Sequence, residues 1–240
     1  MQMEEPRCCI IIPAYNHERS AALVAAKALA LGFPVVAVDD GSTDSTGKTL
    51  EAVEGLTLLS HPENRGKGAA LLTAFGHAAR FADWAITIDA DGQHDPDDAL
   101  TLARAIPKDS RPIIIGSRQG MEGRHVPWTS RFGREFSNFW VRSAGGPRLG
   151  DTQSGMRAYP LPETLQLGVK SRRFQFEVEV LVRAARKGIP VIEVPVRVHY
   201  PEGAERVSHY RPFVDFLRNS STFTRLIIGR IFTSPNGPPP

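Results

Sequence analysis

The chain has 240 residues and a mass of 26.3 kDa, enough for one large domain or two small ones. Hydrophobic residues make up 41% and charged residues 23%, a globular composition that excludes disorder of the whole chain. The net charge of +3 is unevenly distributed, because residues 1–100 carry 7 Lys and Arg against 15 Asp and Glu, whereas residues 101–240 carry 22 against 11. A basic second half suits an anionic partner such as a nucleic acid, a membrane surface or a phosphorylated small molecule, and an unevenly charged solvated surface is the simpler alternative.

Three features bear on the cellular compartment. No apolar run approaches the roughly 20 residues needed to span a bilayer. The N-terminus, MQMEEPR, carries two Glu and no long apolar run follows it, so we expect no secretory signal. Cys8 and Cys9 are adjacent, and neighbours on a strand face opposite sides of a sheet, so a fold stapled by disulfides is excluded. We therefore expect a cytoplasmic protein in a reducing compartment.

The first 118 residues alternate short apolar segments with helical patterns. We predict strands at Arg7–Ile12, Pro34–Asp39, Leu56–Ser60, Trp84–Asp89 and Pro112–Ser117. The helices predicted between them cover residues 17–31, 44–54, 66–81 and 97–106. The strands are apolar throughout rather than alternating, which is typical of a parallel sheet buried on both faces. This order predicts an α/β fold with a doubly wound, mostly parallel, Rossmann-like sheet and helices on both faces.

The pattern changes after residue 118. We predict a loop over 119–128, a basic amphipathic helix over 129–144 and a turn-rich stretch over 145–155. A helix over 174–187, a strand over 189–200 and a last basic helix over 209–232 follow. Gly188 suits a left-handed cap, and Pro195 places its strand at an edge or a bulge of the sheet. No linker is long enough to separate domains, so we expect one domain over 1–232 and a disordered tail over 233–240.

Polar and charged residues concentrate after the predicted strands. The five loops at the carboxyl ends read PAYN at 13–16, DDGSTD at 39–44, HPENRGKG at 61–68, DADGQHD at 89–95 and GSR at 116–118. Ligands of open parallel sheets bind beyond this edge. Turns are polar in general, but that does not account for the concentration of paired aspartates. We therefore predict that the loops form one cleft.

The fourth loop has the features of a metal site. Asp89 and Asp91 flank one residue, so both carboxylates can face one point as the strand ends. Such hard oxygen ligands suit Mg²⁺ or Mn²⁺, with substrate phosphates completing the shell, and Gln93 adds a carbonyl oxygen. An EF-hand is excluded because Gly92 stands at the fourth position of the loop instead of the sixth, and Leu100 stands at the twelfth.

Two other loops suit a nucleotide. Asp39 and Asp40 precede a glycine that permits a tight turn, and they can accept hydrogen bonds from a ribose hydroxyl or a base N–H. The segment NRGKG at 64–68 opens a helix whose N-terminus can hold an anion. It lacks the spacing of a P-loop, and no G-x-G-x-x-G supports a dinucleotide site.

The joint motif set resembles glycosyltransferase family 2, and within it the dolichol- or polyprenol-phosphate sugar synthases. The motifs are IIPAYN, VDDGSTDST, NRGKGAAL, IDADGQHDP, IIGSR, DTQSGMRAY and FQFEVEVLVRAARKG, in order from about residue 8 to about residue 210. The resemblance implies a GT-A fold, a nucleotide-diphosphate sugar donor, a divalent metal (Mg²⁺ or Mn²⁺) and inversion at the anomeric carbon of a transferred hexose. One departure is His17, which stands where the family usually has Glu, with Glu18 next.

The resemblance also implies roles for individual residues. The nucleoside would contact Pro13, Tyr15, Asp39 and Asp40. The metal would be held by Asp89, Asp91 and Gln93. The nucleotide and the donor phosphate or sugar would lie near Lys67 and Arg118. The sugar and acceptor side would be shaped by Asp151, Ser154 and Arg157, and relatives have a phosphate-contacting loop at Arg206 and Ser208. Residues 7–118 would thus form the donor half and 119–232 the acceptor half, with Asp91, Arg118 and Asp151 as catalytic residues.

The acceptor decides the mechanism. Breaking the anomeric C–O bond leaves a diphosphate with growing negative charge, which a metal and Arg118 would stabilise. A hydroxyl acceptor needs a general base, whereas a phosphate acceptor is already ionised at pH 7. We expect a polyprenyl-phosphate-type lipid acceptor that Asp151 positions. The alternative is a hydroxyl acceptor on a glycan or lipid, with Asp151, followed by Glu177, as the candidate base.

The C-terminal segment 208–232 suits a lipid surface. Its arginines, Arg211, Arg218, Arg225 and Arg230, recur about seven residues apart among Phe, Leu and Ile, along one side of a helix. This favours peripheral contact with anionic lipid on the cytoplasmic face of a membrane. A helix packed on the domain and a homodimer contact are equally open alternatives.

Other classes of function fit less well. No nucleic-acid-binding module appears, so we expect no nucleic-acid partner. A phosphohydrolase of the D-x-D-x-T type would not have Gln93, and a sugar nucleotidyltransferase needs a Gly-rich first loop where this chain has PAYNHERS. A pseudoenzyme that only binds a donor is disfavoured by the intact Asp89 and Asp91.

Overall fold

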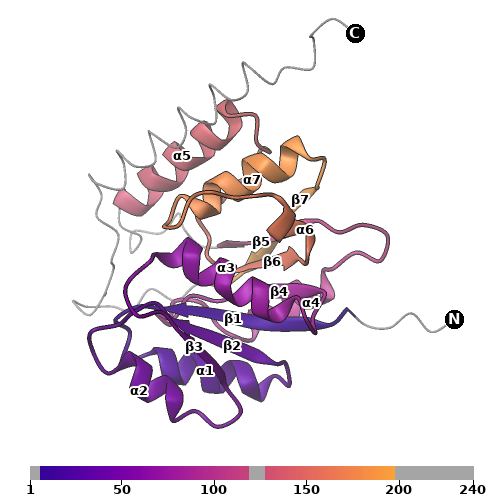
Figure 1. Ribbon diagram of the computed structural model, residues 1–240. Coiled ribbons are helices and arrows are strands. Elements are labelled where there is room, and N and C mark those ends of the chain that lie inside the picture. Colours follow the sequence, from indigo (N-terminus) through magenta and orange to yellow (C-terminus); the bar gives the residue numbers. More distant parts are fainter. Residues whose placement is uncertain (1–5, 119–127, 198–240) are drawn as a thin grey trace, which may run out of the picture.

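A seven-stranded sheet forms the centre of the protein, which the computed structural model describes over residues 6–118 and 128–197, with the backbone alone for 128–133 (Figure 1). The strands are β1 (Cys8–Ala14), β2 (Val35–Asp39), β3 (Thr57–Ser60), β4 (Trp84–Thr87), β5 (Ile113–Arg118), β6 (Arg157–Pro160) and β7 (Val191–Val196). The helices are α1 (Ala21–Ala30), α2 (Thr46–Glu51), α3 (Lys67–Ala78), α4 (Asp98–Arg104), α5 (Trp128–Ser143), α6 (Glu163–Gln166) and α7 (Phe176–Arg186).

The strand order is β3-β2-β1-β4-β6-β5-β7, and every neighbouring pair is parallel except the two that include β6. The predicted α/β fold with a mostly parallel sheet is confirmed. The sequence patterns do not predict β6, whose four residues lie antiparallel between β4 and β5. As a result β6 carries the end of the DTQSGMR segment into the middle of the sheet.

Helices cover both faces of the sheet (Figure 1). Alternate residues of β1 enter two different cores, as the two-residue period of a strand requires. Cys8 and Ile10 pack in the core beside α1 and α4, whereas Cys9 and Ile11 pack in the core beside α3 and α7. The prediction that the two cysteines face opposite sides is confirmed, and both are buried and free.

Two predicted features of the second half are confirmed. Gly188 has a φ of 71° two residues after the last residue of α7, and the Ile189 N–H donates to the Ala184 carbonyl at 2.9 Å, so a left-handed cap ends this helix. Pro195 lies in β7, which is an edge strand. The predicted helix over 209–232 and the tail 233–240 lie outside the described residues. Within the two described ranges, no helix is long and apolar enough to cross a membrane.

Candidate active site

The loops after the first four strands meet at one edge of the sheet. Ala14 of β1 pairs with Asp39 of β2, which pairs with Ser60 of β3, while β4 lies beside β1 on its other side. The first two loops are joined through Asn16, whose φ of 55° lies in the left-handed region that asparagine tolerates. Its Oδ1 accepts the Thr43 N–H at 2.8 Å. The predicted convergence of these loops is therefore found.

His17 and Glu18, where the chain departs from the usual family pattern, both contact the start of α2. The His17 N–H donates to Thr46 Oγ1 at 2.8 Å, and Glu18 Oε2 accepts the Ser45 N–H at 3.0 Å. A carboxylate at this position accepts a hydrogen bond from a backbone amide at the start of the helix, and its negative charge interacts favourably with the positive end of the helix dipole. Glu18 thus helps to fix the first loop against the second.

Asp40 is buried, with 2% exposure, and holds the third loop. Its carboxylate accepts hydrogen bonds from His61 Nδ1 at 2.6 Å, the Arg65 N–H at 3.0 Å and the Gly66 N–H at 2.7 Å. Because these two amides precede α3, this chain's own carboxylate binds where the sequence suggests an external anion. His61 is a partner that the sequence analysis missed.

The other predicted nucleoside contacts differ in exposure. Asp39 is half-buried and its Oδ1 accepts the Ser42 N–H at 3.0 Å. Tyr15 is half-buried directly after β1, whereas Pro13 is buried within that strand beside Val38. Asp39 and Tyr15 are therefore the better placed of the predicted residues to meet a ligand.

Lys67 begins α3 and bridges two carboxylates from distant parts of the chain. Its Nζ lies 2.6 Å from Asp89 Oδ1 and 2.6 Å from Glu177 Oε1. Burial alone would lower the pKa of Lys67, but the two carboxylates raise it, so the side chain is an ammonium. Burial alone would raise the pKa of Asp89, but Lys67, with smaller contributions from His94 and His17, lowers it. The predicted donor and acceptor halves are thus linked by one cation.

Asp89 also packs closely against Gly155, a residue that the sequence analysis did not single out. A Cβ at position 155 would lie 2.6 Å from Asp89 Cγ and 2.7 Å from its Oδ1. Only glycine allows the carboxylate to approach this backbone. In the loop 89–95, which carries Asp89, Asp91 Oδ1 accepts the Gln93 N–H at 3.0 Å and shapes the turn.

The donor atoms of this loop fit a divalent cation that arrives with a phosphate ligand. Mg²⁺ is usually held by one or two carboxylates together with substrate phosphates rather than by a complete protein cage. Asp89, Asp91 and Gln93 offer such a partial set. Among the described residues, no group of three or more His, Cys, Asp and Glu side chains could hold a metal ion, so the metal site stays a prediction.

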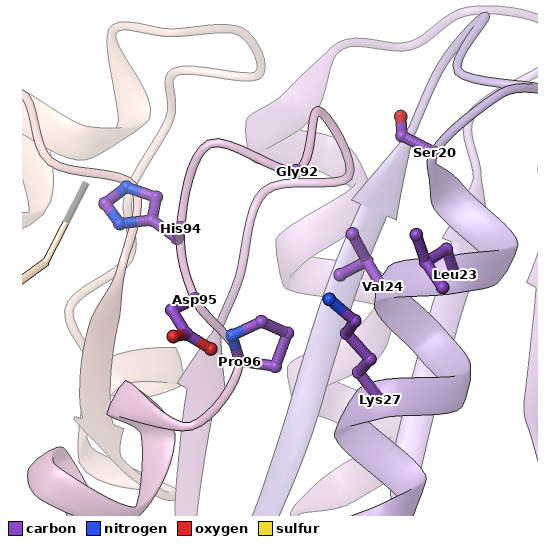
Figure 2. Close-up of a pocket in the computed structure, with 8 residues that line it drawn as sticks. All are labelled: Ser20, Leu23, Val24, Lys27, Gly92, His94, Asp95 and Pro96. Carbon is purple, nitrogen blue, oxygen red and sulfur yellow. The ribbon is translucent and has the colours of Figure 1, made fainter. Parts of the chain in front are cut away.

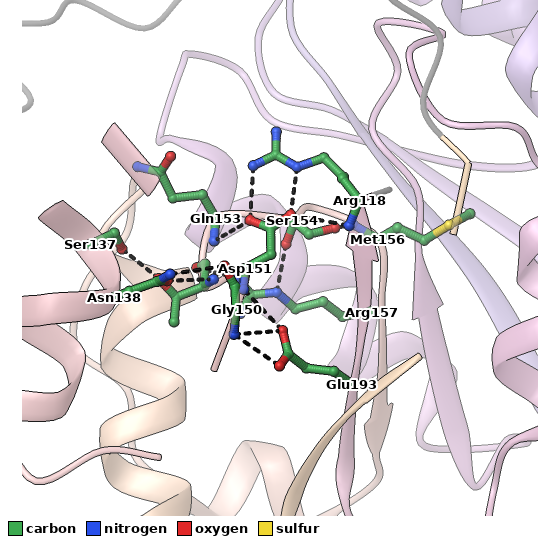
Figure 3. Close-up of polar contacts among 11 residues, drawn as sticks. Arg118, Ser137, Asn138, Gly150, Asp151, Gln153, Ser154, Met156, Arg157 and Glu193 are labelled. Carbon is green, nitrogen blue, oxygen red and sulfur yellow. Dashed lines mark hydrogen bonds and ion pairs between the residues drawn. The ribbon is translucent and has the colours of Figure 1, made fainter. Parts of the chain in front are cut away.

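Arg118 and Asp151 form a buried ion pair (Figure 3). Arg118 Nε donates to Asp151 Oδ2 at 2.7 Å and its Nη2 donates to Oδ1 at 2.9 Å, a bidentate arrangement. The Asp151 side chain is 0% exposed and that of Arg118 is 12% exposed. Burial alone would raise the pKa of Asp151, but Arg118 lowers it overall. The structure brings these two predicted residues together, with the carboxylate ionised.

Glu193 of β7 holds the backbone on which Asp151 stands (Figure 3). It accepts the Gly150 N–H at 2.9 Å and the Asp151 N–H at 2.9 Å. On the other side, Asn138 of α5 accepts the Thr152 N–H at 3.0 Å. The alternating sequence of β7 makes Glu193 look like an ordinary solvent-facing residue, so its contact with residues 150 and 151 could not be foreseen.

Arg157 has a different environment from the one the resemblance suggests. It is fully buried, and its guanidinium donates to the carbonyls of Ser154 at 2.7 Å, Glu177 at 2.8 Å and Thr152 at 2.9 Å. Ser154 is buried as well, and its Oγ accepts the Met156 N–H at 3.3 Å. Both side chains therefore hold the 151–157 segment in shape, and a direct contact with the donor stays a prediction. Arg206 and Ser208 lie outside the described residues.

His94 is buried beside the charged residues of the site. Its Nδ1 has no hydrogen-bond partner among the described residues. Burial lowers the pKa of His94, while Asp89 and Asp151 act to raise it and Arg118 and Lys67 act to lower it. The pKa is lowered overall, so the ring is neutral near pH 7. Figure 2 shows the ring turned away from α1, on the far side of its loop from Lys27.

A cavity of about 160 Å³ lies between α1 and this loop (Figure 2). It is lined by Ser20, Leu23, Val24, Lys27, Gly92, His94, Asp95 and Pro96. Ligand sites usually occupy about 300–1,000 Å³. The cavity is therefore too small for a nucleotide-sugar, and neither Asp89 nor Asp91 lines it.

Comparison with known protein families identifies the chain as a glycosyltransferase. Residues 9–159 match Glycosyl transferase family 2, and the chain belongs to that family. A UDP-N-acetylglucosamine–dolichyl-phosphate N-acetylglucosaminyltransferase of Methanococcus voltae is 31% identical over 215 residues, covering 80% of this chain and 86% of the relative. An undecaprenyl-phosphate mannosyltransferase of Micrococcus luteus is 32% identical over 204 residues, covering 79% and 82%. The crystal structure of a mycobacterial protein has a TM-score of 0.67 at 20% identity, covers 97% of this chain and 77% of its own, and shows the same fold.

Proposed function

We propose that this glycosyltransferase moves a sugar from a nucleotide-diphosphate sugar to a polyprenyl-phosphate-type lipid, with inversion at the anomeric carbon and with Mg²⁺ or Mn²⁺. The observation that carries the choice of acceptor is the buried Arg118–Asp151 pair. A general base works best with a pKa near the working pH. Asp151 has a lowered pKa and both of its oxygens bind Arg118, so it is a poor base.

A phosphate acceptor needs no such base. Its second pKa is about 6, so an oxygen is already ionised at pH 7. In the proposed step this oxygen attacks the anomeric carbon while the C–O bond to the nucleoside diphosphate breaks, and the electron pair of that bond stays on the leaving diphosphate. No proton has to be removed. The names of the two relatives from Methanococcus and Micrococcus, each of which includes a lipid phosphate, support the same acceptor.

The residues of the cleft would divide the work as follows. Tyr15 and Asp39, with Pro13 and Asp40 behind them, would receive the nucleoside. Asp89, Asp91 and Gln93 would hold the divalent cation, which when bound would neutralise charge on the diphosphate. Lys67 and Arg118 supply positive charge to the donor phosphates, and Asp151 orients Arg118. Fixed charges aimed at developing charge stabilise a transition state more than a ground state.

The acceptor half extends beyond the described residues. We propose that residues 1–232 form one domain. In this proposal residues 208–232 contact the membrane and Arg206 contacts a phosphate. The support is chemical, because a polyprenyl chain is held in a bilayer and the four arginines of 208–232 suit anionic headgroups. A homodimer through the same segment is the competing proposal. Liposome flotation of the full chain and of a chain ending at residue 207 separates the two.

The test of the proposed function is transfer of label into lipid. Purified protein is mixed with radiolabelled UDP-glucose, UDP-GlcNAc or GDP-mannose, short-chain polyprenyl phosphate and Mg²⁺ or Mn²⁺, with EDTA as a control. Label entering the organic phase with one donor, and not in EDTA, is the expected result. Consumption of a donor with no label in the lipid would contradict the proposed lipid-phosphate acceptor. Transfer that EDTA leaves unchanged would contradict the proposed requirement for a metal.

A further inference from the structure

Lys67 binds the residue that the proposed function assigns to the metal. A divalent cation and the Lys67 ammonium would both bind the carboxylate of Asp89, and the Lys67 Nζ lies 2.6 Å from Asp89 Oδ1. The rest of that carboxylate is confined, because Gly155 packs against it so closely that a Cβ there would overlap. The side chain keeps 27% exposure, so part of it remains accessible to a ligand. Two cations and one confined carboxylate imply competition.

Lys67 has a second carboxylate at the same distance. Its Nζ is 2.6 Å from Glu177 Oε1, and the Glu177 side chain is 11% exposed. Moving a buried ammonium away from its only partner is costly, because an unpaired buried charge is strongly destabilising. Glu177 removes most of that cost, since Lys67 remains paired when it leaves Asp89. The carbonyl of Glu177 also accepts Arg157 Nη1 at 2.8 Å, which fixes the start of α7 and hence this carboxylate.

We propose that Lys67 competes with the divalent cation for Asp89 and that Glu177 holds the Lys67 ammonium when the cation binds. This inference rests on the proposed function, since it takes Asp89 as a metal ligand. The consequence is that metal alone binds weakly, whereas metal accompanied by the donor diphosphate gains phosphate oxygens that offset the competition. Lys67 and Glu177 thereby couple metal binding to donor binding.

The test is the affinity of the full chain for Mn²⁺ alone, measured from the free-ion signal in electron paramagnetic resonance. Only binding that Asp89→Asn removes is counted. Lys67→Gln should bind Mn²⁺ tighter by about tenfold, the value of one charge-assisted hydrogen bond. Glu177→Gln should bind it several-fold more weakly, because Lys67 then has Asp89 as its remaining partner. Lys108→Gln and Glu163→Gln are charge-matched controls near the amino ends of the parallel strands, and their affinities for Mn²⁺ should match that of the wild type.

The double variant Lys67→Gln/Glu177→Gln decides the mechanism. Its net charge equals that of the wild type, so a simple field effect predicts wild-type affinity. Competition predicts the affinity of Lys67→Gln instead, because Glu177 acts only through Lys67. A double variant that matches the wild type, or no gain of Mn²⁺ binding in any variant, overturns the inference. The double variant also avoids leaving two carboxylates facing each other, so it remains informative if Lys67→Gln folds poorly.

The two proposals fail in different ways. If label transfer to lipid is abolished by EDTA but the variants bind Mn²⁺ alike, this inference is wrong and the proposed function stands. If transfer does not depend on metal, the metal part of the proposed function is wrong.

Discussion

Replacing Gly155 with alanine should displace the Asp89 carboxylate without unfolding the protein. A Cβ at this position would lie 2.6 Å from Asp89 Cγ and closer still to its Oδ2, whereas ordinary contact begins at 3.4 Å, so the carboxylate has to retreat by at least about 0.8 Å. A shift of this size should disturb the 2.6 Å contact between Asp89 Oδ1 and Lys67 Nζ. A misplacement of about 1 Å at a reacting centre costs about 10²-fold in rate. We therefore expect kcat/KM to fall by about 10²-fold and the free energy of unfolding to fall by about 1–3 kcal/mol.

The matched control is Gly76→Ala in α3, where an added Cβ meets nothing within 4 Å. It should keep full activity and gain about 0.5–1 kcal/mol of stability, because alanine is the better helix former. Steady-state transfer kinetics and urea denaturation of both variants provide the comparison. If Gly155→Ala keeps wild-type kcat/KM while Asp89→Asn is inactive, the position of this carboxylate is not critical and the reasoning is refuted.

Three further predictions concern the network around the cleft. Asp151→Asn removes a carboxylate whose pKa is lowered in the folded state, so the carboxylate stabilises the fold above about pH 4 and less as the pH falls through its folded pKa. The stability difference between the variant and the wild type should therefore shrink in denaturation series run from pH 7 to pH 3. A difference that stays constant over this range would contradict the ion pair. Asp40→Asn leaves an amide of the third loop facing an NH₂ group and should lower the free energy of unfolding by about 2 kcal/mol in urea, while an unchanged midpoint would rule out this role. Glu193→Gln should lower kcat through a looser Asp151 and cost about 1 kcal/mol of stability or less, and an effect on KM alone would argue against positioning.

Much of the fold follows from the sequence because its strands are unusually uniform. The runs CCIII at 8–12 and VVAV at 35–38 are apolar on both faces, as a buried parallel strand requires, and the polar loops after them mark one edge of the sheet. Strand β6 could not be predicted in the same way. Its sequence RAYP is short and contains proline, and it is a strand because Ala158 pairs with both Ile86 and Ile114. Those pairings are tertiary contacts between distant segments.

The roles of buried charges were the least predictable part of the site. Arginine is rarely fully buried, and the resemblance places Arg157 in the stretch that shapes the sugar and acceptor side, whereas the structure surrounds its guanidinium with carbonyl oxygens. Asp40 likewise looks like a ligand-binding aspartate, but three internal donors occupy it. Arg118 and Asp151 lie 33 residues apart in the chain, and the resemblance gave them separate roles, whereas the structure pairs them with each other. Which partner a charge finds depends on the tertiary fold.

In the proposed function the nucleophile is a phosphate, and Asp151 positions Arg118 instead of removing a proton. The decisive experiment offers one labelled donor to polyprenyl phosphate and to the corresponding polyprenol in parallel, with wild type and Asp151→Asn. We expect label to enter the phosphorylated lipid alone, with residual transfer in the variant. Label entering the alcohol, and lost by several orders of magnitude in Asp151→Asn while the donor still binds, would contradict it and make Asp151 a general base.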